Sequence, residues 1–127
     1  MTDFARLMND YFVKYLAGQK GSGSNTMKTY RDTFVQLLEF MNEKKHIRAD
    51  CIEVDSFSYD IINEFLEYLE KEKGVSISTR NNRLAAIRSF FKYTGYHEPK
   101  YLNISVSIRE ISKKKTGDRQ MNYLSVN

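Results

Sequence analysis

The sequence predicts an all-α protein, a compact bundle of four to five helices around one hydrophobic core. Apolar residues recur at spacings of three and four along most of the chain, which is the pattern of amphipathic helices. Glycines and helix-capping residues separate these segments, as expected where one helix ends and the next begins. The length of 127 residues suits a single domain with one core.

The first two predicted helices are joined by a short flexible loop. The first apolar stripe consists of Phe4, Leu7, Met8, Tyr11, Phe12, Tyr15 and Leu16. Gly18 is expected to end that helix, and Asn25, which closes the loop Gly-Ser-Gly-Ser-Asn over 21–25, can cap the next one. The second stripe consists of Met27, Tyr30, Phe34, Leu37, Leu38 and Met41. It predicts a helix that ends in the polar residues 42–45.

The third predicted helix follows a segment without helical periodicity. Residues 46–57 are therefore expected to form an extended connection that packs across the bundle. Ser58 can cap the helix, and Gly74 stands where a left-handed residue is expected to end it. The stripe consists of Ile61, Ile62, Phe65, Leu66 and Leu69.

The fourth predicted helix begins at a cap formed by Ser78 and ends at Gly95. Its stripe consists of Leu84, Ile87, Phe90 and Phe91. Pro99, the only proline, lies beyond the end of this helix, where it cannot interrupt it. Apolar positions in 101–111 mix periods of two and four and indicate a short fifth helix. Residues 112–127 are polar and are expected to form a tail or linker.

Charge is segregated along the chain, although the formal net charge is only +4. Residues 55–73 hold six acidic side chains against two basic ones, a local charge of −4 that leaves +8 for the rest. Residues 78–97 contain four basic side chains and no acidic one. A face that binds a polyanion requires such segregation, which also arises by chance on solvated helices.

The composition indicates neither a catalytic site nor a metal or cofactor site. Cys51 is the only cysteine, which excludes an internal disulfide and a multi-cysteine metal site and suits a reducing cytoplasm. His46 and His97 have no second ligand at metal-binding spacing. No glycine-rich phosphate loop and no apolar run of membrane-spanning length occur, so we expect no cofactor, no small-molecule substrate and no membrane partner.

The most informative surface is the predicted outer face of the fourth helix. Asn82, Ala85, Ser89 and Lys92 lie nearly opposite its apolar stripe, and Arg88 lies on one flank. Small residues there permit close approach to a groove, and the basic ones can neutralise phosphates. The backbone N–H groups of Thr79 and Arg80 are expected to be uncapped and available to a phosphate oxygen.

The second helix offers a weaker counterpart over its first two turns. Opposite its stripe lie Asn25, Lys28, Thr29, Asp32 and Gln36, with Arg31 on the flank. Taken by themselves, these residues are compatible with a polyanion-binding face and equally with a solvated basic surface.

One segment resembles a known family. Residues 79–93 match the pattern T-x-N-x-x-L-x-A-I-x-x-F-F-x-Y of the N-terminal core-binding, SAM-like domain of tyrosine recombinases and phage-type integrases. The similarity extends over about residues 3–112 and includes 25–30 and 65–69. Residues 114–125 resemble the interdomain linker of these enzymes, and Tyr123-Leu124-Ser125 is similar to the start of their catalytic domain.

This resemblance implies a DNA-binding domain over 1–112 and a linker over 113–127 that leads to a catalytic domain absent from this chain. The domain would form half of a clamp around duplex DNA at a recombination site, together with other recombinase subunits, in the cytoplasm. Its candidate DNA contacts are Asn25, Thr26, Lys28, Thr29, Arg31, Thr79, Arg80, Asn82, Arg83, Ser89, Lys92, Lys113, Lys114 and Lys115.

The resemblance also implies that this chain has no catalytic activity of its own. The nucleophilic tyrosine and its activating residues lie in the C-terminal domain of such recombinases, and no residue of this sequence matches them. The alternative function is a helical protein-interaction domain, in which the basic faces are solvated and the aromatic stripes recruit a partner.

Overall fold

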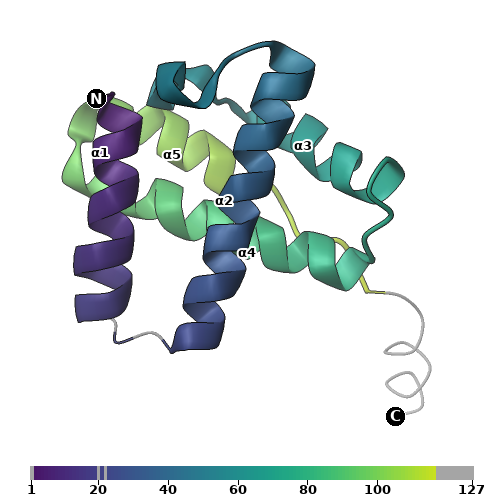
Figure 1. Ribbon diagram of the computed structural model, residues 1–127, viewed down its shortest axis with the longest axis horizontal. Helices are drawn as coiled ribbons and strands as arrows, with labels where there is room; N and C mark the ends of the chain where they lie inside the picture. Colours follow the sequence, from purple (N-terminus) through teal and green to yellow (C-terminus); the bar gives the residue numbers. More distant parts are fainter. Residues whose placement is uncertain (1, 20, 22, 117–127) are drawn as a thin grey trace.

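The computed structural model describes residues 2–19, 21 and 23–116, and within them helices are the only regular secondary structure, as predicted (Figure 1). The elements are α1 (Asp3–Asp10), the π-helix η1 (Tyr11–Gln19), α2 (Ser24–Lys45), α3 (Tyr59–Lys71), α4 (Ile77–His97) and α5 (Leu102–Arg109), with short 3₁₀ turns at Ala49–Cys51, Val54–Ser56 and Pro99–Tyr101.

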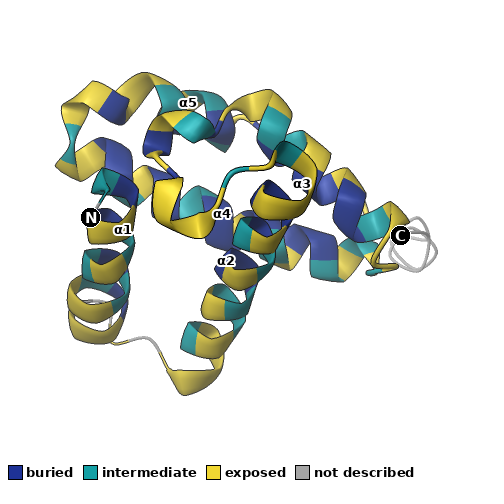
Figure 2. Cartoon of the chain, turned by 45° about the horizontal axis from the view of Figure 1, so that its top comes forward, coloured by how far each residue is buried: buried dark blue, intermediate teal, exposed yellow. Residues whose placement is uncertain are grey.

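Helix α4 runs through the middle of the domain and packs against α2, α3 and α5. The ribbon shows α2 crossing α4, with α5 and α3 toward its two ends and α1 beside α2 (Figure 1). The apolar stripe predicted for α4 is fully buried, as the dark blue turns of this helix show (Figure 2). Burial of an aromatic or aliphatic side chain stabilises a fold by about 1.5–3 kcal/mol, so this stripe is a main source of cohesion.

The first predicted helix changes geometry at Tyr11. From there to Gln19 the backbone forms a π-helix, in which residues five apart share a face. Tyr11 and Leu16 are accordingly both buried, whereas Val13 is exposed and Tyr15 is only partly buried. A period of 3.6 residues instead places Tyr11, Tyr15 and Leu16 in one stripe. It therefore does not predict the change to a π-helix.

Several predicted helix ends are confirmed. The Ile61 N–H donates to Ser58 Oγ at 3.1 Å, so Ser58 caps α3. Gly74 adopts the left-handed conformation with a φ of 69°. Pro99 opens a 3₁₀ turn directly after α4, and the short fifth helix forms at Leu102–Arg109.

Other predicted ends are wrong. Asn25 is not a cap, because α2 already begins at Ser24 and Asn25 lies in its first turn. Ser78 is not a cap either: the Thr79 N–H donates to Ser76 Oγ at 3.1 Å, so α4 begins two residues earlier than predicted. The segment 46–57 is not simply extended, because two 3₁₀ turns interrupt it.

Gly95 does not end α4, which continues to His97. This glycine is buried where α4 meets α5, and a Cβ at this position would lie 2.6 Å from both Cβ and Oγ of Ser105. The sequence signal of a glycine near a helix end is therefore explained by close helix packing and not by helix termination.

We expect Gly95→Ala to destabilise the domain by about 1–2 kcal/mol, since overpacking outweighs the helix propensity gained. Chemical denaturation measures this free energy of unfolding. In the background of Ser105→Gly, which removes the obstructing atoms, the cost of Gly95→Ala should largely vanish; an equal cost in both backgrounds would disprove close packing as its cause.

The start of α1 is tied to the turn between α4 and α5. The Tyr101 hydroxyl donates to Asp3 Oδ2 at 2.9 Å, and Lys100 Nζ lies 3.1 Å from the same oxygen. These two contacts, the tyrosine hydrogen bond foremost, lower the pKa of Asp3 below its usual 3.8. The carboxylate form is thus favoured in the folded protein.

A lowered pKa in the folded state means that Asp3 adds stability above its unfolded pKa, and that this contribution is lost as the pH falls through the folded pKa. We expect Asp3→Asn to reduce stability at pH 7 and to flatten the decline in stability below about pH 4. Thermal unfolding at pH 7 and pH 3 measures both effects; a variant whose deficit is the same at both pH values argues against the lowered pKa.

Candidate nucleic-acid interface

The crossing of α2 and α4 brings two predicted contact residues together. Arg83 Nη1 of α4 lies 3.3 Å from the main-chain oxygen of Thr29 and 3.3 Å from Thr33 Oγ1, both on α2. Thr33 is fully buried and its hydroxyl also donates to the Thr29 oxygen at 2.9 Å. The half-buried Arg83 guanidinium therefore joins the first turns of α2 to the first half of α4.

The predicted contact residues differ widely in exposure. Thr29, Thr79, Arg83 and Ser89 are partly exposed, and Arg80 is buried. The others are exposed: Asn25, Thr26, Lys28, Arg31, Asn82, Lys92, Lys113, Lys114 and Lys115. Most of the candidate residues on both helices are thus accessible to solvent, and Arg80 is the main exception.

Acidic partners compete for some of these charges. Lys28 Nζ lies 3.0 Å from Asp32 Oδ2 on the same helix, and Lys114 Nζ lies 2.9 Å from Glu70 Oε2. Arg31 and Lys92 form no ion pair with any residue in the described ranges. Among the candidate basic residues of α2 and α4, Arg31 and Lys92 are therefore the exposed ones whose charge is not paired with an acidic side chain of the described residues.

The predicted phosphate site at the start of α4 is wrong. The Thr79 N–H is already bonded to Ser76 Oγ, and the Arg80 N–H donates to the Ser76 main-chain oxygen at 2.9 Å. Because Ser76 rather than Ser78 is the cap, both groups lie two residues deeper in the helix than expected and are satisfied by Ser76.

Ser89 lies on the side of α4 that faces η1. The Tyr11 hydroxyl and Ser89 Oγ are 2.6 Å apart, and the Tyr11 ring is completely buried. Burial, the main cause, raises the pKa of the Tyr11 phenol far above its usual range, so the group is neutral at all ordinary pH values. Ser89 thereby serves as the polar partner of a core tyrosine.

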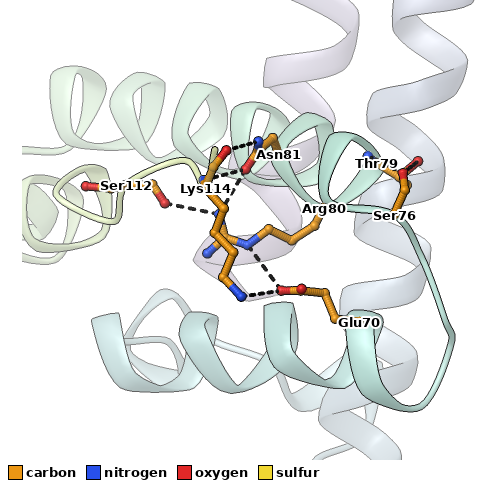
Figure 3. Close-up of polar contacts among 7 residues, drawn as sticks. All are labelled: Glu70, Ser76, Thr79, Arg80, Asn81, Ser112 and Lys114. Carbon is orange, nitrogen blue, oxygen red and sulfur yellow. Dashed lines mark hydrogen bonds and ion pairs between the residues drawn. The ribbon is translucent and has the colours of Figure 1, made fainter. Parts of the chain in front are cut away.

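Arg80 points into a polar cluster at the end of the described chain (Figure 3). Its Nη1 donates to Asn81 Oδ1 and to the Ser112 main-chain oxygen, both at 3.0 Å, and its Nε lies 3.7 Å from Glu70 Oε2. Sequence reasoning did not assign Glu70, Asn81 or Ser112 to a site. Asn81 carried a signal, since it stands three residues before Leu84 on the apolar stripe, where a polar side chain needs a buried partner.

No group of three potential metal ligands occurs among the residues that the structure describes. In that same part of the chain, no helix is both long and apolar enough to cross a membrane. The aromatic stripes assigned to a protein partner in the alternative function lie mostly in the core: Tyr11, Phe34, Phe65, Phe90 and Phe91 are buried. These buried members of the stripes are not available to a partner.

A family model described as the phage integrase N-terminal SAM-like domain matches residues 10–95, which is more than half of the chain. The chain belongs to this family. The match includes the α2–α4 crossing and the whole 79–93 motif, so the resemblance noted in the sequence is confirmed.

Relatives of this integrase domain are named as recombinases. The integrase/recombinase y4rC of Sinorhizobium fredii is 31% identical over 121 residues, 95% of this chain and 36% of that protein. A tyrosine recombinase XerC of Natranaerobius thermophilus is 30% identical over 104 residues, 82% of this chain and 33% of that protein. The integrase domain thus spans about a third of the length of these relatives, and no solved structure matches it.

The Tyr11–Ser89 contact in this integrase domain predicts an asymmetric response to mutation. Ser89→Ala leaves a buried hydroxyl without a partner and should cost about 1–3 kcal/mol, whereas Tyr11→Phe leaves a partly exposed serine that water can satisfy and should cost less. Denaturation of the two single variants and the double variant measures these costs. If Tyr11→Phe is the more damaging change, the hydrogen bond is not the reason for Ser89.

Proposed function

We propose that this chain is the DNA-binding domain of a tyrosine recombinase, and that it holds duplex DNA against the surface formed by the start of α2 and the exposed side of α4. Family membership gives the parent activity as recombination. The observation that carries the assignment to this surface is the α2–α4 crossing, where Arg83 joins two helices that both present basic and amide side chains to solvent.

The chemistry of this surface suits a nucleic acid. Helix α4 carries basic side chains and no acidic one over residues 78–97. Arg31 and Lys92 are exposed and can bond phosphate oxygens, which gives affinity without sequence preference. The exposed amide of Asn82 can both donate and accept, as reading of a base edge requires.

The contact set proposed from the structure is narrower than the one read from the sequence. Arg80 and Ser89 act inside the protein, through Ser112 and Tyr11 respectively. The other twelve candidates are exposed or partly exposed and remain in the set: Asn25, Thr26, Lys28, Thr29, Arg31, Thr79, Asn82, Arg83, Lys92, Lys113, Lys114 and Lys115.

We further propose that residues 113–127 link this domain to a catalytic domain, which would supply the nucleophile and the activating residues for strand cleavage. In that arrangement the two domains would grip the duplex from opposite sides, and other recombinase subunits would bind neighbouring sites on the same DNA in the cytoplasm. The part of this segment beyond 116, including Tyr123-Leu124-Ser125, lies outside the described residues.

Binding to duplex DNA should be salt-dependent. If about five phosphates are neutralised, the slope of log K against log salt concentration should lie near −4 to −5. Replacing Arg31 and Lys92 together by Gln should weaken binding and make the slope less steep by about two, because each lost phosphate contact removes about 0.9. Fluorescence anisotropy with a labelled duplex over a series of salt concentrations measures both values.

The matched control is the pair Arg48→Gln and Lys71→Gln, which removes the same charge from exposed residues elsewhere on the domain. We expect it to change the slope far less. Equal losses in the two pairs would show that net charge, and not this surface, governs binding. Absence of salt-dependent binding by the unaltered chain would overturn the proposed function and leave the protein-interaction alternative.

A further inference from the structure

The end of the described chain is held to the domain by an amide side chain. Asn81 Nδ2 donates to the Lys114 main-chain oxygen at 2.8 Å, and the Lys114 N–H donates to Asn81 Oδ1 at 3.0 Å (Figure 3). This pair of opposed bonds satisfies both backbone groups of one residue. Because the contact is to the main chain, it fixes the position of residue 114 regardless of its side chain.

Arg80 stabilises this contact by hydrogen bonds to Asn81 and to the main chain of Ser112. Its Nη1 donates to Asn81 Oδ1 and also to the Ser112 main-chain oxygen, each at 3.0 Å. Only 5% of the Arg80 surface and 8% of the Asn81 surface are exposed. A guanidinium is costly to bury without hydrogen-bond partners. The bond to Ser112 is therefore one of the contacts that offset the burial of Arg80.

Glu70 completes the cluster from α3. Its Oε2 accepts from Lys114 Nζ at 2.9 Å and lies 3.7 Å from Arg80 Nε. The Glu70 carboxylate therefore contacts both the buried Arg80 and the side chain of Lys114. Backbone hydrogen bonds outside the helices end at Ile111 in the described ranges, so beyond that residue side chains hold the chain in place.

We propose that Glu70, Arg80 and Asn81 form a clasp that binds the main chain of residues 112–114 and fixes the direction in which the chain leaves the domain. Arg80 and Asn81 are positioning residues in this arrangement. The clasp holds Lys114 against Glu70 and leaves Lys113 and Lys115 exposed beside it. Its consequence for DNA rests on the proposed function: the clasp sets where these two lysines meet the phosphate backbone.

Hydrogen exchange of the Lys114 amide in the 127-residue chain tests the clasp directly, without DNA. In the unaltered chain this amide should exchange at least about tenfold more slowly than in an unstructured peptide, and Asn81→Ala should abolish that protection. The control Asn42→Ala makes the same change at an exposed position of α2 and should leave the Lys114 amide protected. Thermal unfolding of each variant separates loosening of the clasp from loss of the fold.

A second variant keeps the test decisive if Asn81→Ala fails to fold. Asn81→Asp has the same shape and retains a partner for Arg80, but it places a carboxylate oxygen against the Lys114 carbonyl in place of the donor. It should therefore also raise the exchange rate at Lys114. An unprotected Lys114 amide in the unaltered chain, or protection that survives both Asn81 variants, would overturn the clasp.

The link to DNA is tested by a double-mutant cycle in the same anisotropy assay. Asn81→Ala should weaken duplex binding in the unaltered background and should have no further effect once Lys113 and Lys115 are both changed to Gln. An equal loss in the two backgrounds would show that the clasp does not act through these lysines. If the chain does not bind DNA at all, the proposed function fails while the exchange experiment still decides the clasp.

Discussion

The packing of Phe90 in α4 is the interaction on which the remaining structure depends. Its ring lies within 5.6 Å, centroid to centroid, of the rings of Phe4, Tyr11, Phe34 and Phe91, so one side chain joins α1, η1 and α2 to the central helix. All four pairs meet edge to face, a geometry that adds to the hydrophobic gain, and three of them join α4 to another element. Because this cluster fixes the orientation of α4, it also fixes which of its polar residues reach solvent.

The polar residues of α4 divide into two groups as a result. Asn82 and Lys92 are exposed, whereas Arg80 and Asn81 turn toward α3 and the end of the described chain. Arg83 lies between the groups and joins α4 to α2. One helix therefore supplies both the proposed DNA-binding surface and the contacts that hold residues 112–114.

The two groups of polar residues on α4 have different roles in the proposed function. The chain spans about a third of the length of its relatives. In the proposed arrangement, the direction in which the chain leaves this domain would help to set the position of the catalytic domain. Hydrophobic packing sets the angle between α2 and α4, and the polar cluster around Arg80 sets the position of residue 114. One constraint is hydrophobic and the other is polar, but both act on α4.

The sequence by itself determined the helical fold, its central apolar stripe, the family and most of the exposed basic residues, because amphipathic periodicity and a local motif are written in neighbouring residues. It placed Asn25, Ser78 and Gly95 at helix ends, and each lies inside a helix instead. Capping by Ser76 and the contact of Gly95 with Ser105 are choices among nearby alternatives that packing makes. The sequence also made Arg80, through the family resemblance, and Ser89, through periodicity, candidate DNA contacts. Only the tertiary structure decided that Arg80 binds Ser112 and Ser89 binds Tyr11, since these partners lie 32 and 78 residues away in the chain and meet only after the core has assembled.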